Sequence, residues 1–300
     1  MPKYYDGPPR VLVGYDGSAD SHAALRLACL EVVSREAELL LVTSIDDIVF
    51  GSAWNVVLDA NELKHNAARQ LNEAVQLAQA EGVPLPEIFT DVVMGNPAQQ
   101  LTRLSERVSL VVIGRRSVSG GRPYTGSTAV QLAGTCRCPL LITSASHKLP
   151  EQGIEKLTVG VDSSRNRGRV ALAWGYDIAD RYEGELRVLN VVRSASPGRW
   201  FSSSKLSEAE LTAAVDSAQS KVAAMVESYA DANPDVDTTV EVVSGEPLKL
   251  LTAASKESDL LLVEVQSSFP SYAVGGIARG IITHSACPVG VIRSKEAYAG

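Results

Sequence analysis

Short apolar runs alternate with longer amphipathic stretches along the first half of the chain. Runs typical of buried strands occupy residues 10–14, 38–42, 88–94, 109–113 and 138–143. The stretch from Asp59 to Glu81 instead places its apolar residues at helical spacing, namely Leu63, Ala67, Leu71, Val75 and Ala78. Strands that alternate with helices predict a parallel sheet with helices on both faces.

Helix boundaries are marked by residue types that cap or end helices. Ser18 or Asp20 is suited to cap a helix that runs to about Arg35. Gly82, followed by Pro84, ends the long amphipathic helix. The Gly95–Pro97 segment opens another helix, because proline is well tolerated in a first turn.

The second half of the chain repeats these landmarks in the same order. The segment 156–164 corresponds to 10–18, so that Asp162 takes the place of Asp16. The further matches are 185–191, the apolar stripe 211–229, 243–247, 259–263 and 286–293. Six ordered matches indicate a duplication. The polar segment 147–153 contains Pro150 and is typical of a linker, which predicts domains 1–147 and 154–300.

A glycine-rich loop, Gly114–Ser127, joins the fourth predicted strand to a helix that starts at Thr128. Glycines let a backbone approach a ligand closely, and a helix start suits a phosphate. Arg115, Arg116 and Arg122 can pair with phosphate oxygens, although a solvated loop also accounts for them. The loop matches neither the P-loop nor the G-x-G-x-x-G pattern, so by itself it fits a plain turn as well as a ligand site.

Composition narrows the class of protein. Hydrophobic residues make up 45% and charged residues 21% of 300 residues, as in globular chains. The net charge of -7 argues against a nucleic-acid binder or an anionic-membrane binder. No apolar leader or membrane-length run is present, and four cysteines do not form a disulfide framework. We therefore expect a cytoplasmic protein.

Candidate chemistry beyond the loop is sparse. Cys136 and Cys138 have no second cysteine pair or histidine at zinc-ligand spacing, so buried inert thiols are favoured over a metal site. No catalytic triad, metal cluster or catalytic carboxylate pair is recognisable, so we expect a protein that is not an enzyme.

Four motifs resemble those of the universal stress protein family, in a tandem two-domain form. They are Val13–Ser18, Gly95-x-Pro97, the Gly114 loop and Cys138-Pro139. The resemblance implies a flavodoxin-like (Rossmann-like) domain with a five-stranded parallel sheet in each half. It also implies a stress-response regulatory role, pairing of the two domains through their last strands as an intrachain pseudo-dimer, and homodimers of whole chains.

The same resemblance implies an ATP site in the first domain. ATP-binding members carry G-x2-G-x9-G-[ST] after the fourth strand, an aspartate after the first, and an adenine-proximal residue at the end of the second. The aspartate is Asp16, for which a turn role is the alternative, and the second-strand residue is Ser44. The loop positions are Gly114, Ser117 in place of the second glycine, and Gly126–Ser127 after eight residues, with Thr128 following.

The second domain departs further from this pattern. Asp162 and Val191 fit, whereas Glu264 replaces the first glycine, Ser267 the second, and Gly275–Gly276 the final Gly-Ser pair. A carboxylate facing the phosphates would repel them. We expect no ATP binding there in the family manner. A non-nucleotide-binding interaction scaffold is the alternative function for the whole chain.

Overall fold

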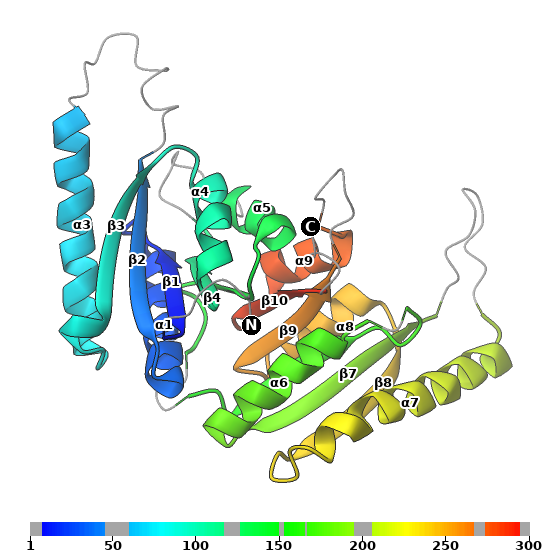
Figure 1. The fold of residues 1–300 in the computed structure, drawn as a ribbon. Helices are drawn as coiled ribbons and strands as arrows, with labels where there is room; N and C mark the ends of the chain where they lie inside the picture. The colour runs from blue at the N-terminus through cyan, green and yellow to red at the C-terminus, as the bar shows by residue number, and fades with distance from the viewer. Residues whose placement is uncertain are drawn as a thin grey trace, which may run out of the picture. The chain divides into compact units, whose positions relative to one another are not determined.

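The computed structural model describes residues 8–45, 60–116, 127–149, 153–165, 167–194, 206–266 and 274–294. The chain divides into two compact units (Figure 1). The main part of unit 1 is Met1–Leu149, and the main parts of unit 2 are Pro150–Val265 and Gly275–Lys295. Each unit is an α/β domain built on a parallel sheet.

Five parallel strands form the sheet of unit 1, in the order β3-β2-β1-β4-β5. Their bounds are β1 Arg10–Gly14, β2 Glu38–Ile45, β3 Ile88–Met94, β4 Leu110–Gly114 and β5 Leu140–Thr143. Both faces of β1 and β4 are covered, and Val11, Leu12 and Val13 are completely buried. These central strands are therefore continuously apolar rather than alternating.

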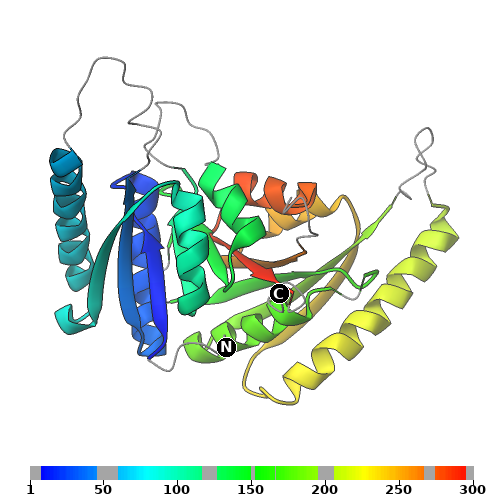
Figure 2. The same cartoon turned by 45° about the horizontal axis from the view of Figure 1, so that its top comes forward.

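Helices cover both faces of this sheet (Figure 2). Helices α1 (Ala19–Arg35) and α3 (Ala60–Ala80) pack on one face. Helices α4 (Pro97–Leu104) and α5 (Ser127–Thr135) pack together on the other. Short 3-10 turns, η1 (Leu85–Glu87) and η2 (Ser105–Arg107), precede β3 and β4.

Unit 2 has the same strand order, β8-β7-β6-β9-β10, again fully parallel. Its strands are β6 Lys156–Val161, β7 Glu185–Arg193, β8 Thr238–Gly245, β9 Leu260–Val265 and β10 Val289–Arg293. Its helices are α6 Arg169–Tyr182, α7 Glu208–Ala230, α8 Pro247–Ala254 and α9 Gly276–His284. The prediction of two five-stranded parallel α/β domains is confirmed.

Most element boundaries lie close to those predicted. Strand β3 matches the predicted limits, and α3 differs from its predicted span by one residue at each end. Strand β2 continues three residues beyond Val42, because Thr43–Ile45 stay paired with β3. Strand β5 begins at Leu140, after the Cys138-Pro139 segment.

The capping residue of α1 is Ser18 rather than Asp20. The Ser18 side chain accepts a hydrogen bond from the N–H of Ser21, at 3.0 Å. Asp20 lies inside the helix and has other partners. Of the two alternatives left open by the sequence, the first is confirmed.

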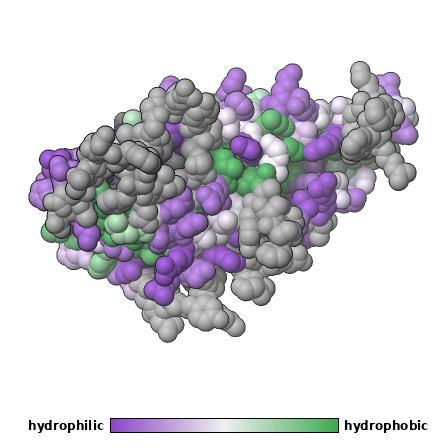
Figure 3. Space-filling model, turned by 90° about the horizontal axis from the view of Figure 1, so that it is seen from above, coloured by the Kyte–Doolittle hydropathy of each residue, from purple (hydrophilic) through white to green (hydrophobic). Residues whose placement is uncertain are grey.

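No helix among the described residues is long and apolar enough to cross a membrane. Figure 3 shows one face of the molecule, on which hydrophilic residues are interspersed with smaller hydrophobic areas. Among the atoms coloured there, no continuous nonpolar surface covers this face.

Candidate functional site

The strand order of unit 1 reverses between β1 and β4. These two strands are neighbours in the sheet but are not consecutive in the sequence. Gly14 of β1 pairs with Ile113 of β4, so the two strands end at the same edge of the sheet. In open α/β sheets, ligands bind outside the carboxyl ends of the strands where the order reverses. Asp16 follows β1 and Gly114 ends β4, so both sequence-predicted residues flank this point.

Asp16 forms the turn between β1 and α1. Its Oδ1 accepts a hydrogen bond from the N–H of Ser18 at 3.0 Å, and Gly17 between them has a φ of 72°. A positive φ favours glycine, which explains the Asp-Gly-Ser sequence of this turn. The turn role of Asp16 is thus visible in the structure, while its contact with a ligand stays a prediction.

Ser44 lies near the end of β2, the strand next to β1. Its Oγ donates a hydrogen bond to the carbonyl oxygen of Gly95 at 2.6 Å. Gly14 pairs with Val42, so Asp16 and Ser44 each follow a paired residue by two positions on adjacent strands. The fold therefore brings the two predicted adenine-proximal residues to neighbouring places on one edge.

Gly114 is a glycine for a packing reason. A Cβ atom there would lie 2.8 Å from the carbonyl carbon of Asp20 and 2.9 Å from the backbone nitrogen of Ser21. Real Cβ contacts are never that short, so any side chain would push α1 away from β4. The first motif glycine is required by the approach of the helix, whether or not a ligand binds.

Asp20 connects three segments at this edge of the sheet. Its Oδ1 accepts from the N–H of Ala145 at 2.9 Å and from the Ser144 hydroxyl at 3.2 Å. Its Oδ2 accepts from the backbone N–H of Arg116 at 3.0 Å and from Arg116 Nε at 3.2 Å. Only 4% of Asp20 is exposed, so these four donors replace water around a buried carboxylate.

The pKa of Asp20 reflects this surrounding. Burial by itself raises the pKa, but the hydrogen bonds from Ala145, Arg116 and Ser144 and the charge of Arg116 outweigh it. The net result is a pKa below the ordinary value of 3.8. Asp20 therefore stays ionised wherever the protein is folded near neutral pH. The sequence suggests Asp20 only as a helix cap. The two arginines after Gly114 are the sequence feature that points to a charge partner for it.

The two arginines after Gly114 are turned toward the end of β5. Arg116 pairs with Asp20, and its terminal nitrogen lies 3.4 Å from the Ser144 hydroxyl. Arg115 donates to the hydroxyls of Ser144 at 3.2 Å and Ser146 at 3.5 Å. Burial, followed by the charge of Arg116, lowers the pKa of Arg115, and Asp20 opposes this shift.

The rest of the glycine-rich loop, including the predicted residues Ser117 and Gly126, lies outside the described residues. Ser127 is the first residue of α5, and Thr128 is half-buried in its first turn. The predicted entry of the loop into a helix start is therefore present. The predicted role of each of these residues toward a phosphate stays a prediction.

In unit 2, the connection between β6 and its helix is longer and folds on itself. Asp162 and Arg167 exchange two backbone hydrogen bonds at 3.0 Å, and Asp162 Oδ1 also accepts from the N–H of Ser164. Buried Asn190 donates to Ser163 at 2.9 Å, one position before Val191 on β7. Asp162 thus acts as a turn residue in the structure, as Asp16 does in unit 1.

Glu264 caps the first helix of unit 2. Its Oε2 accepts from the backbone N–H groups of Gly168 and Val170, each at 3.1 Å. The capping position, Gly168, has no side chain to satisfy these groups itself. At the position corresponding to Gly114, unit 2 therefore places an anion against the start of α6. Gly275 and Gly276 begin α9 without a side-chain cap.

The universal stress protein family matches residues 8–144 and again residues 153–293. The chain belongs to the universal stress protein family. Universal stress proteins similar to it include one of Mycolicibacterium smegmatis, 24% identical over 302 residues, covering 95% of this chain and 97% of the relative. Another, from Mycobacterium tuberculosis, is 26% identical over 259 residues, covering 86% and 89%. The predicted family is confirmed, and the tandem arrangement is shared.

Solved structures also resemble the whole chain. A universal stress protein of Archaeoglobus fulgidus aligns with a TM-score of 0.68 at 18% identity, covering 95% of this chain and 98% of that one. A Pseudomonas aeruginosa protein described as functionally unknown aligns with a TM-score of 0.67 at 15% identity, covering 98% and 95%. At these identities, the likeness supports the tandem fold alone.

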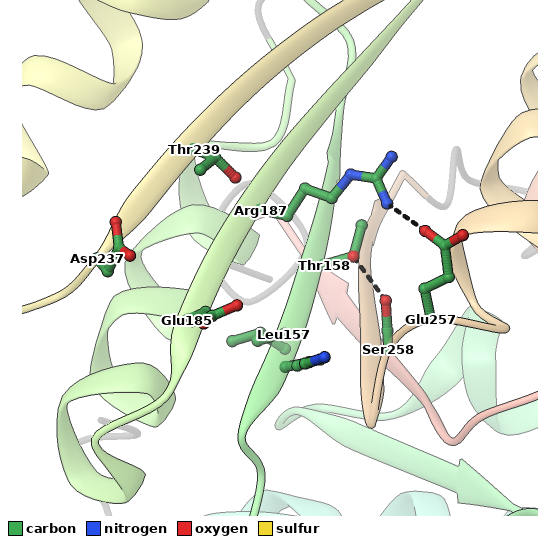
Figure 4. A pocket seen from close by; sticks show the side chains of 9 residues that line it. Leu157, Thr158, Glu185, Arg187, Asp237, Thr239, Glu257 and Ser258 are labelled. Carbon is green, nitrogen blue, oxygen red and sulfur yellow. Dashed lines mark hydrogen bonds and ion pairs between the residues drawn. The ribbon is translucent and has the colours of Figure 1, made fainter.

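A cavity of about 330 Å³ lies in unit 2 near the starts of β6, β7 and β8 (Figure 4). Arg187 pairs there with Glu241 and Glu257, and the hydroxyls of Thr158 and Ser258 are 2.7 Å apart. The other lining residues are Lys156, Leu157, Glu185, Asp237 and Thr239. Acidic side chains outnumber basic ones in this lining, and the cavity is at the opposite end of the strands from Asp162. This excess of negative charge disfavours the binding of nucleotide phosphates in the cavity.

The cysteines show no sign of metal chemistry. Cys136 and Cys138 are buried with their sulfurs 3.9 Å apart, and burial raises the pKa of the Cys138 thiol well above its ordinary value. A thiol held neutral is a poor metal ligand. No group of three or more potential metal ligands occurs among the described residues.

Proposed function

We propose that this universal stress protein is a cytoplasmic, nucleotide-responsive regulator of the stress response without turnover chemistry of its own. ATP binds in unit 1. Its adenine lies near Asp16 and Ser44, and its phosphates lie over the loop from Gly114 to Ser127. Unit 2 is a structural partner or holds a different ligand.

One observation carries this proposal: Asp16 and Gly114 flank the point where the strand order of unit 1 reverses, and Ser44 lies on the next strand at the same edge. Asp16 follows β1 by two residues, Ser44 lies near the end of the adjacent β2, and Gly114 ends β4 at the same edge. The loop after Gly114 leads into the start of α5, where unpaired N–H groups favour phosphate. The family includes ATP-binding members with an aspartate after the first strand and a glycine-rich loop after the fourth, and the loop of this chain departs from their pattern at Ser117 and in its length.

Unit 2 departs further from the ATP-binding pattern than unit 1 does. Glu264 holds a negative charge at the corner where Gly114 stands in unit 1. The connection after β6, in which Asp162 and Arg167 pair with each other, is a further difference from the Asp16 turn of unit 1. We therefore propose one ATP per chain. The binding energy would shift the populations of loop conformations and so change the surface offered to a partner.

An interaction scaffold that binds no nucleotide is the second candidate. It is favoured by Ser117 in place of a motif glycine and by the loop that is one residue shorter than the family pattern. On this alternative, unit 1 keeps Gly114 only because α1 packs against it. Pairing of the two repeats through their last strands, and of whole chains into homodimers, stays a prediction that rests on the family resemblance.

The deciding experiment is calorimetric titration of ATP into the purified full-length protein, preceded by mass spectrometry of small molecules released from it on denaturation. Saturable binding of about one ATP per chain supports the proposal, and absence of binding by nucleotide-free protein favours the scaffold. A phosphate-release assay in parallel tests for turnover. Sustained, protein-dependent release of phosphate would identify an enzyme and overturn the proposal as stated.

A further inference from the structure

The Asp20 carboxylate accepts hydrogen bonds from two segments that are distant in sequence, one at Arg116 and one at Ala145. Arg116 comes two residues after Gly114 and lies at the beginning of the loop assigned to the phosphates. Ala145 comes two residues after the end of β5, where the chain leaves the sheet of unit 1. We propose that Asp20 is a positioning residue that couples the phosphate loop to this exit. The inference rests on the proposed function for the ligand of the loop.

Each oxygen of the Asp20 carboxylate contacts a different segment. Oδ2 takes both hydrogen bonds from Arg116, and Oδ1 takes both from the β5 exit, Ser144 and Ala145. All four of these partners donate to Asp20, so the side chain at this position must offer an acceptor oxygen on both sides. An asparagine has a single acceptor oxygen, and its NH₂ group would face N–H donors on one side or the other.

Additional contacts hold the same cluster together. Ser18, the cap of α1, lies with its hydroxyl 3.4 Å from the carbonyl oxygen of Arg116. Arg115 donates its backbone N–H to the carbonyl of Thr143 at 2.6 Å, and its guanidinium reaches Ser144. The base of the loop therefore cannot shift relative to the end of β5 without breaking bonds on both sides.

Arg116 is the part of this cluster that a phosphate can compete for. Its side chain is 42% exposed, whereas the Asp20 side chain with which it pairs is 5% exposed. A phosphate that attracts the guanidinium would weaken its bond to Oδ2 and alter the electrostatics felt by Oδ1. The Ala145 N–H and the Ser144 hydroxyl would then respond to a ligand bound at the loop.

The end of β9 in unit 2 carries a different carboxylate, that of Glu264, and this carboxylate has a different role. Glu264 belongs to the strand and reaches back to the start of α6, whereas Asp20 belongs to the helix and reaches out to the loop. Unit 2 has Gln266 at the position of Arg116, counted from the paired strands β9 and β4. The arginine-linked bridge is thus a feature of unit 1, the unit assigned to ATP.

The test combines hydrogen exchange with ATP titration in the full-length protein. Without nucleotide, Asp20→Asn should speed exchange of the Arg116 amide, the Ala145 amide or both by about tenfold or more, because the NH₂ group of asparagine replaces the acceptor of at least one of them. Glu31→Gln is the matched control. Glu31 is a completely buried carboxylate on the same helix, paired with Arg35 at 2.7 Å. It should leave both amides unchanged.

In the wild-type protein, saturating ATP should change amide hydrogen exchange at Ala145 as well as at Arg116. The Asp20→Asn variant should bind ATP more weakly and should show no response at Ala145. A response confined to Arg116 would overturn the coupling. If titration shows that wild-type protein binds no ATP, the proposed function fails on its own. Unchanged amide exchange in a folded Asp20→Asn variant would overturn the positioning role. Should this variant not fold, the wild-type response at Ala145 decides.

Discussion

A Cβ atom on Gly114 would lie 2.8 Å from the carbonyl carbon of Asp20, so the end of β4 and the first turn of α1 are in direct backbone contact. In the second repeat, Glu264 stands at the corresponding position, and its carboxylate caps the helix instead. Two solutions to the same corner therefore occur in one chain. One keeps a bare backbone next to a glycine-rich loop, and the other fills the corner with a charge.

Gly114→Ala should destabilise unit 1 even in the absence of ligand. The added methyl group must displace the backbone of α1, and overpacking of this kind costs about 1–3 kcal/mol. Denaturant unfolding of nucleotide-free protein measures the effect. Gly275→Ala is the control, because a Cβ there meets no atom of the described residues within 4 Å and the backbone φ is -57°. Equal stability of Gly114→Ala and wild type would contradict the packing role.

The Asp20 cluster should make stability depend on acid pH. Because the folded-state pKa of Asp20 lies below its ordinary value of 3.8, the carboxylate contributes stability that is present above about pH 4. That contribution is lost as the pH falls through the folded-state pKa. Wild type should therefore exceed Asp20→Asn in unfolding free energy at pH 6, and the gap should narrow toward pH 2. A gap that stays constant over this range would rule out the titration of Asp20 as its source.

The sequence predicted the architecture more fully than the site. Apolar runs and helical stripes located β3 and α3 to within a residue, because burial on one or both faces leaves a periodic pattern. No periodicity reveals that Asp20 reaches Ala145, because 125 positions separate them in the chain. Likewise, Glu264 could be recognised as an unusual residue in the motif, but its capping of α6 depends on how closely the helix approaches the strand.

ATP binding should be asymmetric between the repeats. Gly126→Asp should abolish binding, since it places an anion where the phosphates need a bare backbone. Gly275→Asp, the matched change in the second repeat, should leave the affinity almost unchanged, and its Cβ meets no described residue within 4 Å. Titration calorimetry on both folded variants gives affinity and stoichiometry. Equal loss from the two changes would count against the assignment to unit 1.

Tyr15 carries a buried hydroxyl that has no hydrogen-bond partner among the described residues. Tyr15→Phe should therefore raise the unfolding free energy by about 1 kcal/mol, because the desolvation penalty disappears. Tyr229→Phe provides the contrast, since the Tyr229 hydroxyl donates to the carbonyl of Arg169 at 3.1 Å. This control should lower stability slightly. A loss of stability in Tyr15→Phe would show that the hydroxyl has a partner in solution.

Ionisation of Tyr15 should lower the unfolding free energy at alkaline pH. Burial, followed by the charges of Glu73 and Asp16, raises the pKa of Tyr15 from 10.0 to about 12. The unfolded chain thus ionises first, so stability is fully present below pH 10 and is lost as the pH rises toward 12. Wild type should lose more unfolding free energy over this interval than Tyr15→Phe. Parallel curves for the two proteins would argue against ionisation of this side chain.

Glu264 should contribute to stability and also prevent ATP binding in the second repeat. Its carboxylate accepts from Gly168 and Val170, so Glu264→Gly removes the cap of α6 and should cost about 1 kcal/mol of unfolding free energy. Glu264→Gln keeps an acceptor oxygen without the charge and should lose less. Urea unfolding of both variants separates the hydrogen bond from the charge. Full stability of Glu264→Gly would contradict the capping role.

The binding role is tested by restoring the family pattern in steps. Glu264→Gly alone removes the charge that would repel a phosphate, a repulsion on the order of a few kcal/mol in a partly dry site, where each ~1.4 kcal/mol changes the affinity tenfold. The triple variant adds Ser267→Gly and Gly276→Ser, which rebuild the loop and its hydroxyl. Titration should then show a second ATP per chain at least in the triple variant. If unit 1 still binds ATP while the folded triple variant gains no second site, the obstruction lies elsewhere. The folded connection in which Asp162 and Arg167 exchange backbone hydrogen bonds would then be the next segment to shorten.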